Sequence, residues 1–273
     1  MNTVTRSEQK KYLILLVILG LAIGFLSVCG KSERHNFVVS HGAIIRGDTT
    51  RKEIALVFTG GDFSDGGDHI RDVLKRENVL AGFFFTGDFY RNKKNSRLVQ
   101  TLAENGHYLG PHSDRHLLYC SWKDRDSTLV TKDQFVRDIL NNYREMKRFG
   151  ISRRDAPFFI PPYEWYNETT VQWAQEAGLI LFNFTPGTLS NADYTTPDMK
   201  NYRDSETIYQ SILTYEENHT GGLNGFILLV HIGSHPDRKD KFYLMLKPLV
   251  VELKNRGYRF VRIDKLIGKW IGK

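Results

Sequence analysis

The chain has 273 residues, of which 41% are hydrophobic and 25% charged, a composition typical of globular proteins. Its formal net charge is +7, but the basic residues are scattered and form no stripe with stacking aromatic side chains. Nucleic acid is therefore not an expected partner, and two cysteines are too few for a disulfide framework.

The N-terminus has the pattern of a targeting segment. Arg6, Lys10 and Lys11 precede an uncharged apolar run over residues 12–28, as in a signal peptide. Cys29 follows directly and resembles the lipidated cysteine of a bacterial lipoprotein. An uncleaved membrane anchor is the alternative, because a run of this length is just within the range that spans a bilayer.

These features predict how the chain is organised. We expect a signal peptide or membrane anchor over residues 1–28, a tether over 29–42 and a single catalytic domain over 43–273. With either form of attachment, the domain lies outside the cytoplasm, anchored to a membrane of the cell envelope.

Apolar runs alternate with helical patterns along the domain. The runs predict buried strands at residues 54–58, 81–85, 158–160, 179–182, 226–230 and 259–263. Helices are predicted from the cap Ser96 to Gly106, from the capping box Thr131/Gln134 to Gly150, from the cap Asn167 to Gly178, and over 249–256 with Pro248 in the first turn. The alternation favours parallel strands covered by helices, in a barrel or an open sheet.

Polar residues gather directly after these strands. Residues 59–62 follow the first strand, 86–88 follow the second, and His231 follows the fifth. Active sites of parallel α/β folds collect at this end of the strands. The position of His231 therefore favours a catalytic role over that of a histidine that only caps a core strand.

His112 and His116 are candidate metal ligands. Imidazoles four residues apart lie on one face of a helical turn, where both can bind one ion. By itself such a pair is more often two surface histidines in a polar loop. Ser113 stands where a zincin carries its glutamate, which argues against a thermolysin-like protease.

Six stretches match, in order and spacing, a pattern known from one family. They read ALVFTGGD at 55–62, GFFFTG at 82–87, GHYLGPHSDRH at 106–116, FIPPYE at 159–164, LVH at 229–231 and GYRFVRI at 257–263. With these motifs the chain resembles the polysaccharide deacetylases, the NodB-homology group of carbohydrate esterase family 4. The third stretch, similar to the family's G-H-E-I-G-x-H-[ST]-x-x-H, is the most specific. The resemblance implies a distorted (β/α) barrel with fewer than eight regular strands.

The resemblance also implies a chemistry, the metal-assisted removal of acetyl groups from a glycan. In the family two histidines and one aspartate hold a divalent ion, a second aspartate is the base, and a late histidine protonates the leaving amine. His112 and His116 match the two histidine ligands, and His231 matches the general acid. We therefore expect a divalent metal, Zn²⁺ or alternatively Co²⁺, and an acetylated polysaccharide or oligosaccharide as partner.

The first motif departs from the family pattern. Thr59 and Gly60 stand where the family has its base and its ligand aspartate, and neither side chain can take over that role. Asp62 follows two residues later, after glycines that allow the backbone to bend. We predict Asp62 as the third metal ligand and a catalytic carboxylate, with capping of the next helix as its alternative role.

The fourth motif departs as well. Ile160 replaces the arginine that orients the family's base, and Glu164 ends a stretch similar to the family's F-R-x-P-Y-G. Glu164 is a further candidate catalytic carboxylate at the same rim, and a solvated loop charge is the ordinary alternative. The loop aromatics nearby, Tyr163, Trp122 and Trp165 among them, have faces that suit sugar rings.

Three functions remain open on this evidence. The first is a metal-dependent hydrolase that removes N- or O-acetyl groups from a cell-envelope or dietary polysaccharide. The second is a catalytically inactive, glycan-binding relic of the same fold, and the third is a metal-dependent amidase with a non-sugar substrate. Retention of the three histidines favours an enzyme, whereas the changes at Thr59, Gly60 and Ile160 favour the inactive relic.

Overall fold

We describe residues 37–268 of a computed structural model of the chain. The predicted targeting segment over 1–28 and its cysteine, Cys29, lie outside the described residues. Within residues 37–268 no helix combines the length and the apolar character needed to cross a membrane.

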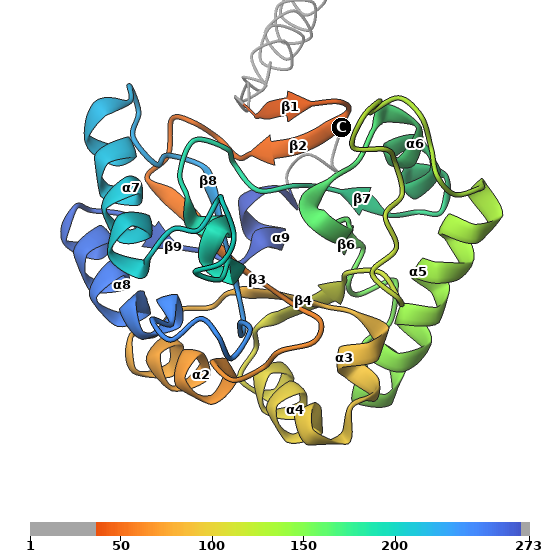
Figure 1. Ribbon diagram of the computed structural model, residues 1–273, viewed down its shortest axis with the longest axis horizontal. Coiled ribbons are helices and arrows are strands. Elements are labelled where there is room, and N and C mark those ends of the chain that lie inside the picture. Colours follow the sequence, from red (N-terminus) through yellow and green to blue (C-terminus); the bar gives the residue numbers. More distant parts are fainter. Residues whose placement is uncertain (1–36, 269–273) are drawn as a thin grey trace, which may run out of the picture. The chain divides into compact units, whose positions relative to one another are not determined.

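A parallel sheet lies at the centre of the domain (Figure 1). Its strand order is β5-β4-β3-β8, with β9 also pairing with β3. The strands are β3 (Glu53–Gly60), β4 (Gly82–Phe85), β5 (Tyr108–Pro111), β8 (Phe226–His231) and β9 (Arg259–Phe260). The central strand β3 is buried at every residue but its first, as expected for a parallel strand covered on both faces.

Two smaller sheets complete the arrangement. β6 (Phe158–Phe159) pairs in parallel with β7 (Ile180–Leu181), and β1 (Val38–Ser40) forms an antiparallel hairpin with β2 (Ala43–Arg46). A single bridge from Ile44 to Phe182 links β2 to the end of β7. The strands between residues 37 and 268 therefore do not form one continuously hydrogen-bonded sheet. This arrangement of strands and helices confirms the prediction of an α/β fold of the distorted (β/α) barrel type.

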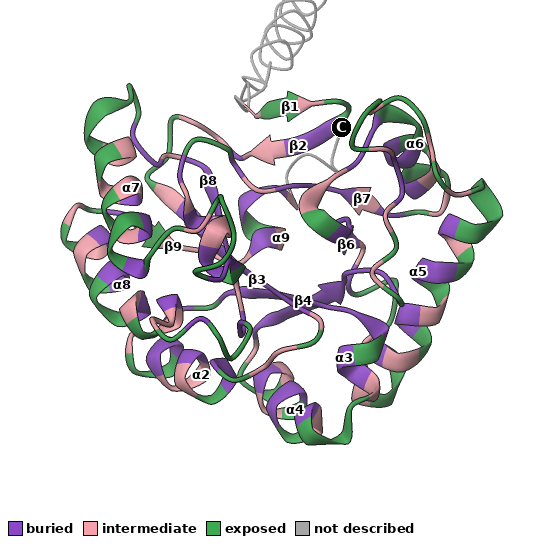
Figure 2. Ribbon diagram, in the orientation of Figure 1, coloured by how far each residue is buried: buried purple, intermediate pink, exposed green. Residues whose placement is uncertain are grey.

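Helices flank the strands, and each of the longer ones is buried on its inner side and exposed on its outer side (Figure 2). They are α2 (Gly67–Arg76), α3 (Gly87–Arg91), α4 (Ser96–Glu104), α5 (Lys132–Met146), α6 (Glu168–Glu176), α7 (Ser205–Asn218), α8 (Leu246–Asn255) and α9 (Ile263–Leu266). Burial on one side is typical of amphipathic helices that pack their apolar face against a sheet.

The predicted helix starts are largely correct. Thr131 and Asn167 each form a capping box at the start of α5 and α6. Pro248 lies in the first turn of α8 as predicted. The predicted cap Ser96 is wrong: it is the first residue of α4, preceded by Asn95, whose side chain forms no capping hydrogen bond there because Asn95 itself is already helical.

The parallel pairing brings several strand ends to one edge. Thr59 pairs with His231, Gly60 with Phe85, and Phe85 with Pro111. Residues that follow these strands therefore meet, as expected for a parallel sheet.

Candidate active site

The loop after β5 holds the histidine pair. The predicted helical turn is wrong, because residues 112–116 form no helix. Ser113 and His116 have φ angles of 74° and 54°, left-handed conformations that bend the loop back on itself. The bend still brings the rings together, with Nε2 of His112 and Nε2 of His116 3.2 Å apart.

The pKa shifts of both imidazoles favour the neutral ring, the charge state that metal ligation requires. Nδ1 of His112 donates to the carbonyl oxygen of Ile160 at 3.0 Å, which leaves Nε2 with its lone pair. Burial, and then the neighbouring His116, hold the pKa of His112 well below its ordinary value. Burial, and then His231, lower the pKa of His116 to about 4. Two neutral nitrogens at this separation fit one tetrahedral ion, whose ligand atoms lie roughly 3.3 Å apart.

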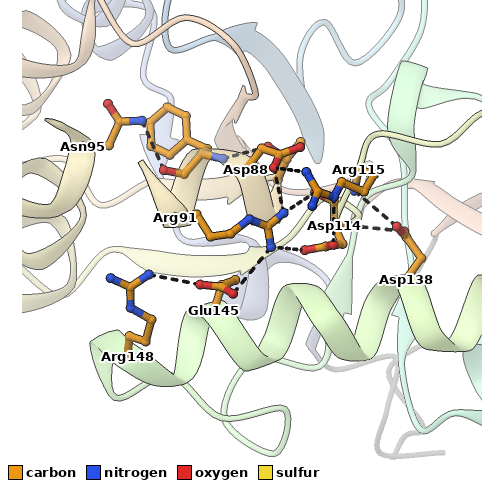
Figure 3. A network of polar contacts seen from close by, with 10 residues as sticks. Asp88, Arg91, Asn95, Asp114, Arg115, Asp138, Glu145 and Arg148 are labelled. Atoms are coloured by element: carbon orange, nitrogen blue, oxygen red, sulfur yellow. Dashed lines mark hydrogen bonds and ion pairs between the residues drawn. The ribbon is translucent and has the colours of Figure 1, made fainter. Parts of the chain in front are cut away.

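Helix α5 holds the backbone of the histidine loop (Figure 3). Oδ1 of Asn142 accepts the N–H of His112 at 2.9 Å. The carboxylate of Asp138 accepts the N–H groups of Asp114 and Arg115, each at 3.2 Å. These bonds fix a loop that has no secondary structure of its own.

Asp138 is expected to be important for stability. Asp138→Ala should lower the free energy of unfolding by about 3 kcal/mol, because the two loop N–H groups and the hydroxyl of Tyr119, at 2.6 Å, lose their acceptor. Equilibrium urea denaturation measures the change, with Arg137→Ala, at an exposed position of the same helix, as the control. Equal stability of the two variants would contradict the prediction.

Ion pairs connect α3 to the same loop (Figure 3). Arg91 contacts Asp114 at 2.7 Å and Asp88 at 2.8 Å. Arg115 contacts Asp88 at 2.7 Å. The buried carboxylate of Asp114, which lies between the two histidines in sequence, is thus paired with Arg91.

His231 ends β8 and forms a dyad with a buried aspartate. Asp193, in the 3₁₀ helix η4 (Ser190–Tyr194), accepts from Nδ1 of His231 at 2.6 Å and from its backbone N–H at 2.8 Å. Burial lowers the pKa of His231, but the charges of Asp193 and then Glu164 outweigh it and raise the pKa above its ordinary value. The ring therefore keeps its proton to a higher pH than a free histidine does.

Glu164 lies beside the histidine pair. It ends η3 (Pro162–Glu164), after β6, and its side chain is 12% exposed, with Oε1 4.0 Å from Nε2 of His112. Burial raises the pKa of Glu164 to about 7, partly offset by His231. The alternative of a solvated loop charge is therefore wrong, because the side chain points inward and is desolvated.

Backbone strain is concentrated at this site. Six non-glycine residues between 37 and 268 have positive φ, and four of them lie in the two loops just described: Ser113, His116, Tyr163 and Glu164. Such conformations cost free energy and persist where the surrounding structure requires them, often at functional sites.

Thr59 and Gly60, the last two residues of β3, provide no carboxylate and are closely packed. Thr59 is buried, and its Oγ1 has no hydrogen-bond partner among the described residues. A Cβ added to Gly60 would lie 2.7 Å from Cγ2 of Ile232 and 2.9 Å from Cδ1 of Phe85. An aspartate therefore does not fit at position 60 in this packing.

Asp62 is not in place as a third ligand. It lies exposed in the bend after β3, and its charge partly offsets the lowering of the His116 pKa. Residues 37–268 contain no group of three His, Cys, Asp or Glu side chains arranged to hold a metal. The predicted set of Asp62, His112 and His116 is thus assembled only in its two imidazoles, since no hydrogen bond holds the exposed Asp62 toward them.

Aromatic rings extend from the histidine pair to the surface. The ring of Tyr163 lies 4.3 Å from that of His116, and Trp122 follows at 5.8 Å from Tyr163 and 5.1 Å from Trp165. Trp122 is 56% exposed and Tyr163 46%. Exposed aromatic faces beside a polar site are suited to stacking on sugar rings.

Known proteins resemble this chain in sequence and fold. The polysaccharide deacetylase family model matches residues 46–182. The chain belongs to the polysaccharide deacetylase family. A curated relative, peptidoglycan-N-acetylglucosamine deacetylase PgdA of Listeria monocytogenes, is 30% identical over 220 residues, which are 81% of this chain and 40% of PgdA. The chain therefore spans less than half of that relative's length.

Solved structures of this deacetylase family share the fold. BA3943, described as a CE4 family pseudoenzyme from Bacillus anthracis, is 19% identical with a TM-score of 0.64, over 84% of this chain and 70% of its own. A family 4 acetyl xylan esterase from Clostridium thermocellum, in complex with a cobalt ion, is 21% identical with a TM-score of 0.59, over 79% of this chain and 90% of its own.

The site thus differs in part from the one predicted for a deacetylase. His112 and His116 come together with Glu164 beside His112, whereas the described residues contain no complete set of three metal ligands. Asp193 was missed, because it lies in the irregular stretch 183–204, where nothing in the local pattern distinguishes it from other polar residues.

Proposed function

We propose that this polysaccharide deacetylase removes N-acetyl groups from a peptidoglycan-like glycan of the cell envelope, with Zn²⁺ bound by His112 and His116. The observation that carries the proposal is the convergence of two neutral imidazoles on one point. The names of relatives such as PgdA support the glycan. The targeting pattern and Cys29 support a lipoprotein at the membrane.

The residues divide the chemistry between them. A bound divalent ion would polarise the acetyl carbonyl and lower the pKa of an attacking water. His231 donates its proton to the leaving nitrogen as the C–N bond breaks, and Asp193 orients the ring. The proton that the water loses passes to a carboxylate at the rim, and Asp62 and Glu164 are the candidates for it.

Release of acetate tests the proposed function. We expect the full-length protein loaded with Zn²⁺ to release acetate from peptidoglycan fragments or N-acetylated chitooligosaccharides, with acetylated xylan as the ester comparison. A chelator should abolish release, and His235→Ala, at an exposed loop histidine outside the site, should keep it. Metal-loaded protein that leaves every acetylated glycan intact would refute the deacetylase function.

A catalytically inactive glycan-binding protein is the second candidate. It is favoured by Thr59 and Gly60, which supply no carboxylate at the end of β3. This function predicts that the same peptidoglycan fragments bind, as measured by the fluorescence of the exposed Trp122, and are recovered with their acetyl groups in place.

A further inference from the structure

A carboxylate lies within reach of the two histidine ligands. Oε1 of Glu164 is 4.0 Å from Nε2 of His112, and two ligand atoms of one tetrahedral ion lie about 3.3 Å apart. A movement of the carboxylate by less than about 1 Å would bring this oxygen to the separation from Nε2 of His112 that two ligand atoms of one ion have. The ring of His112 is fixed from its other side by the carbonyl oxygen of Ile160, so the adjustment falls to Glu164.

The buried Glu164 carboxylate has no hydrogen-bond donor among the described residues. Its side chain is 12% exposed, and no described residue donates a hydrogen bond to its oxygens. Its contact with His112 involves a ring nitrogen that carries a lone pair and not a proton. Burying a carboxylate without hydrogen-bond donors is costly, and the charge of His231 offsets that cost only in part. A positive ion held by His112 and His116 would stabilise the carboxylate further.

The backbone of Glu164 is unfavourable for any residue but glycine. Its φ of 53° follows a φ of 59° at Tyr163, and a non-glycine residue there costs free energy. A long acidic side chain therefore occupies a strained position from which it points at the histidine pair. At the same time β3 ends in Thr59 and Gly60, which have no carboxylate to offer.

We propose that Glu164 is the third metal ligand, so that the acidic ligand of this site comes from the loop after β6 and not from β3 or from Asp62. The inference rests on the metal site of the proposed function. It assigns Asp62, exposed at the rim, no direct bond to the ion.

Binding of Co²⁺ tests this assignment without substrate. Full-length protein is titrated with Co²⁺ and followed by the visible absorption of the bound ion, for Glu164→Gln, Asp62→Asn and the matched control Glu168→Gln, at an exposed position of α6. We expect Glu164→Gln to weaken binding by more than the 10–100-fold typical of outer-shell changes, and the other two variants to stay within about threefold of the wild type. Unchanged binding by Glu164→Gln, or weakened binding by Asp62→Asn, overturns the assignment.

A stability measurement on the metal-free protein adds a second readout. Glu164→Gly removes both the strained backbone and the buried carboxylate, so its Tm should rise by roughly 2–4 °C while Co²⁺ binding weakens. A lower Tm would mark Glu164 as a packing residue and overturn the assignment. Acetate release by the wild type separates the two proposals. If the wild type releases acetate but the Glu164 variants bind Co²⁺ as well as the wild type, only the assignment of Glu164 as a ligand is refuted. If Co²⁺ binding follows the expected pattern but no acetate is released, only the deacetylase function is refuted.

Discussion

His116→Ala is expected to lose the bound metal ion and to lower acetate release by about a thousandfold or more. The substitution removes one of the two neutral nitrogens that lie 3.2 Å apart, which leaves the proposed site with His112 and Glu164 as its only ligands and so weakens its hold on a divalent ion. Polarisation of a carbonyl by a metal contributes several kcal/mol to the transition state, and about 4 kcal/mol corresponds to a factor of roughly 1,000. Elemental analysis of the purified protein and initial rates of acetate release measure the two effects.

The control for this prediction is His219→Ala, at an exposed histidine at the end of α7. It should retain both metal and activity. The separation of 3.2 Å also suits a hydrogen bond from one ring to the other. A His116→Ala protein that keeps a full equivalent of metal would show that the rings of His112 and His116 make only that bond.

His231→Ala is expected to lower acetate release on the order of 10²–10⁴-fold, the usual contribution of a general acid. Metal content should not change, because His231 is hydrogen-bonded to Asp193 and is not one of the proposed metal ligands. Initial rates together with elemental analysis separate this effect from that of His116→Ala. Loss of the metal in His231→Ala would contradict the role of proton donor.

The pH profile identifies what Asp193 contributes. Its carboxylate raises the pKa of His231, so Asp193→Asn should lower that pKa. The protonated form of His231 then disappears at a lower pH, and the alkaline limb of the rate profile moves to lower pH. An unmoved limb would indicate that Asp193 only fixes the ring in place.

Much of the fold could be predicted from the sequence because its signals are local. The apolar runs at 54–58 and 226–230 became β3 and β8, the two most extensively paired strands. β5 was missed as a strand because Tyr108–Pro111 contains glycine and proline, and its pairing depends on the neighbouring β4. α7 was missed because few of its residues are buried, so its apolar pattern is weak.

The site could be predicted only in part, because side-chain direction depends on the loops. The four-residue spacing predicted that His112 and His116 lie close together. In the structure a left-handed turn at Ser113, and not a helix, brings the two rings into contact. The closeness of Asp62 to the end of β3 in sequence predicts a ligand, whereas in the structure this residue is exposed and belongs to no group of three metal ligands. Nothing in the local sequence predicts a left-handed Glu164, because such a conformation is disfavoured for glutamate.

The close packing around Gly60 limits how this site can be redesigned. An acidic side chain introduced at position 60 would collide with Ile232 and Phe85, both fully buried, and shrinking a core phenylalanine first would by itself cost about 3–5 kcal/mol. A carboxylate at the end of β3 therefore needs at least two coordinated substitutions in the core.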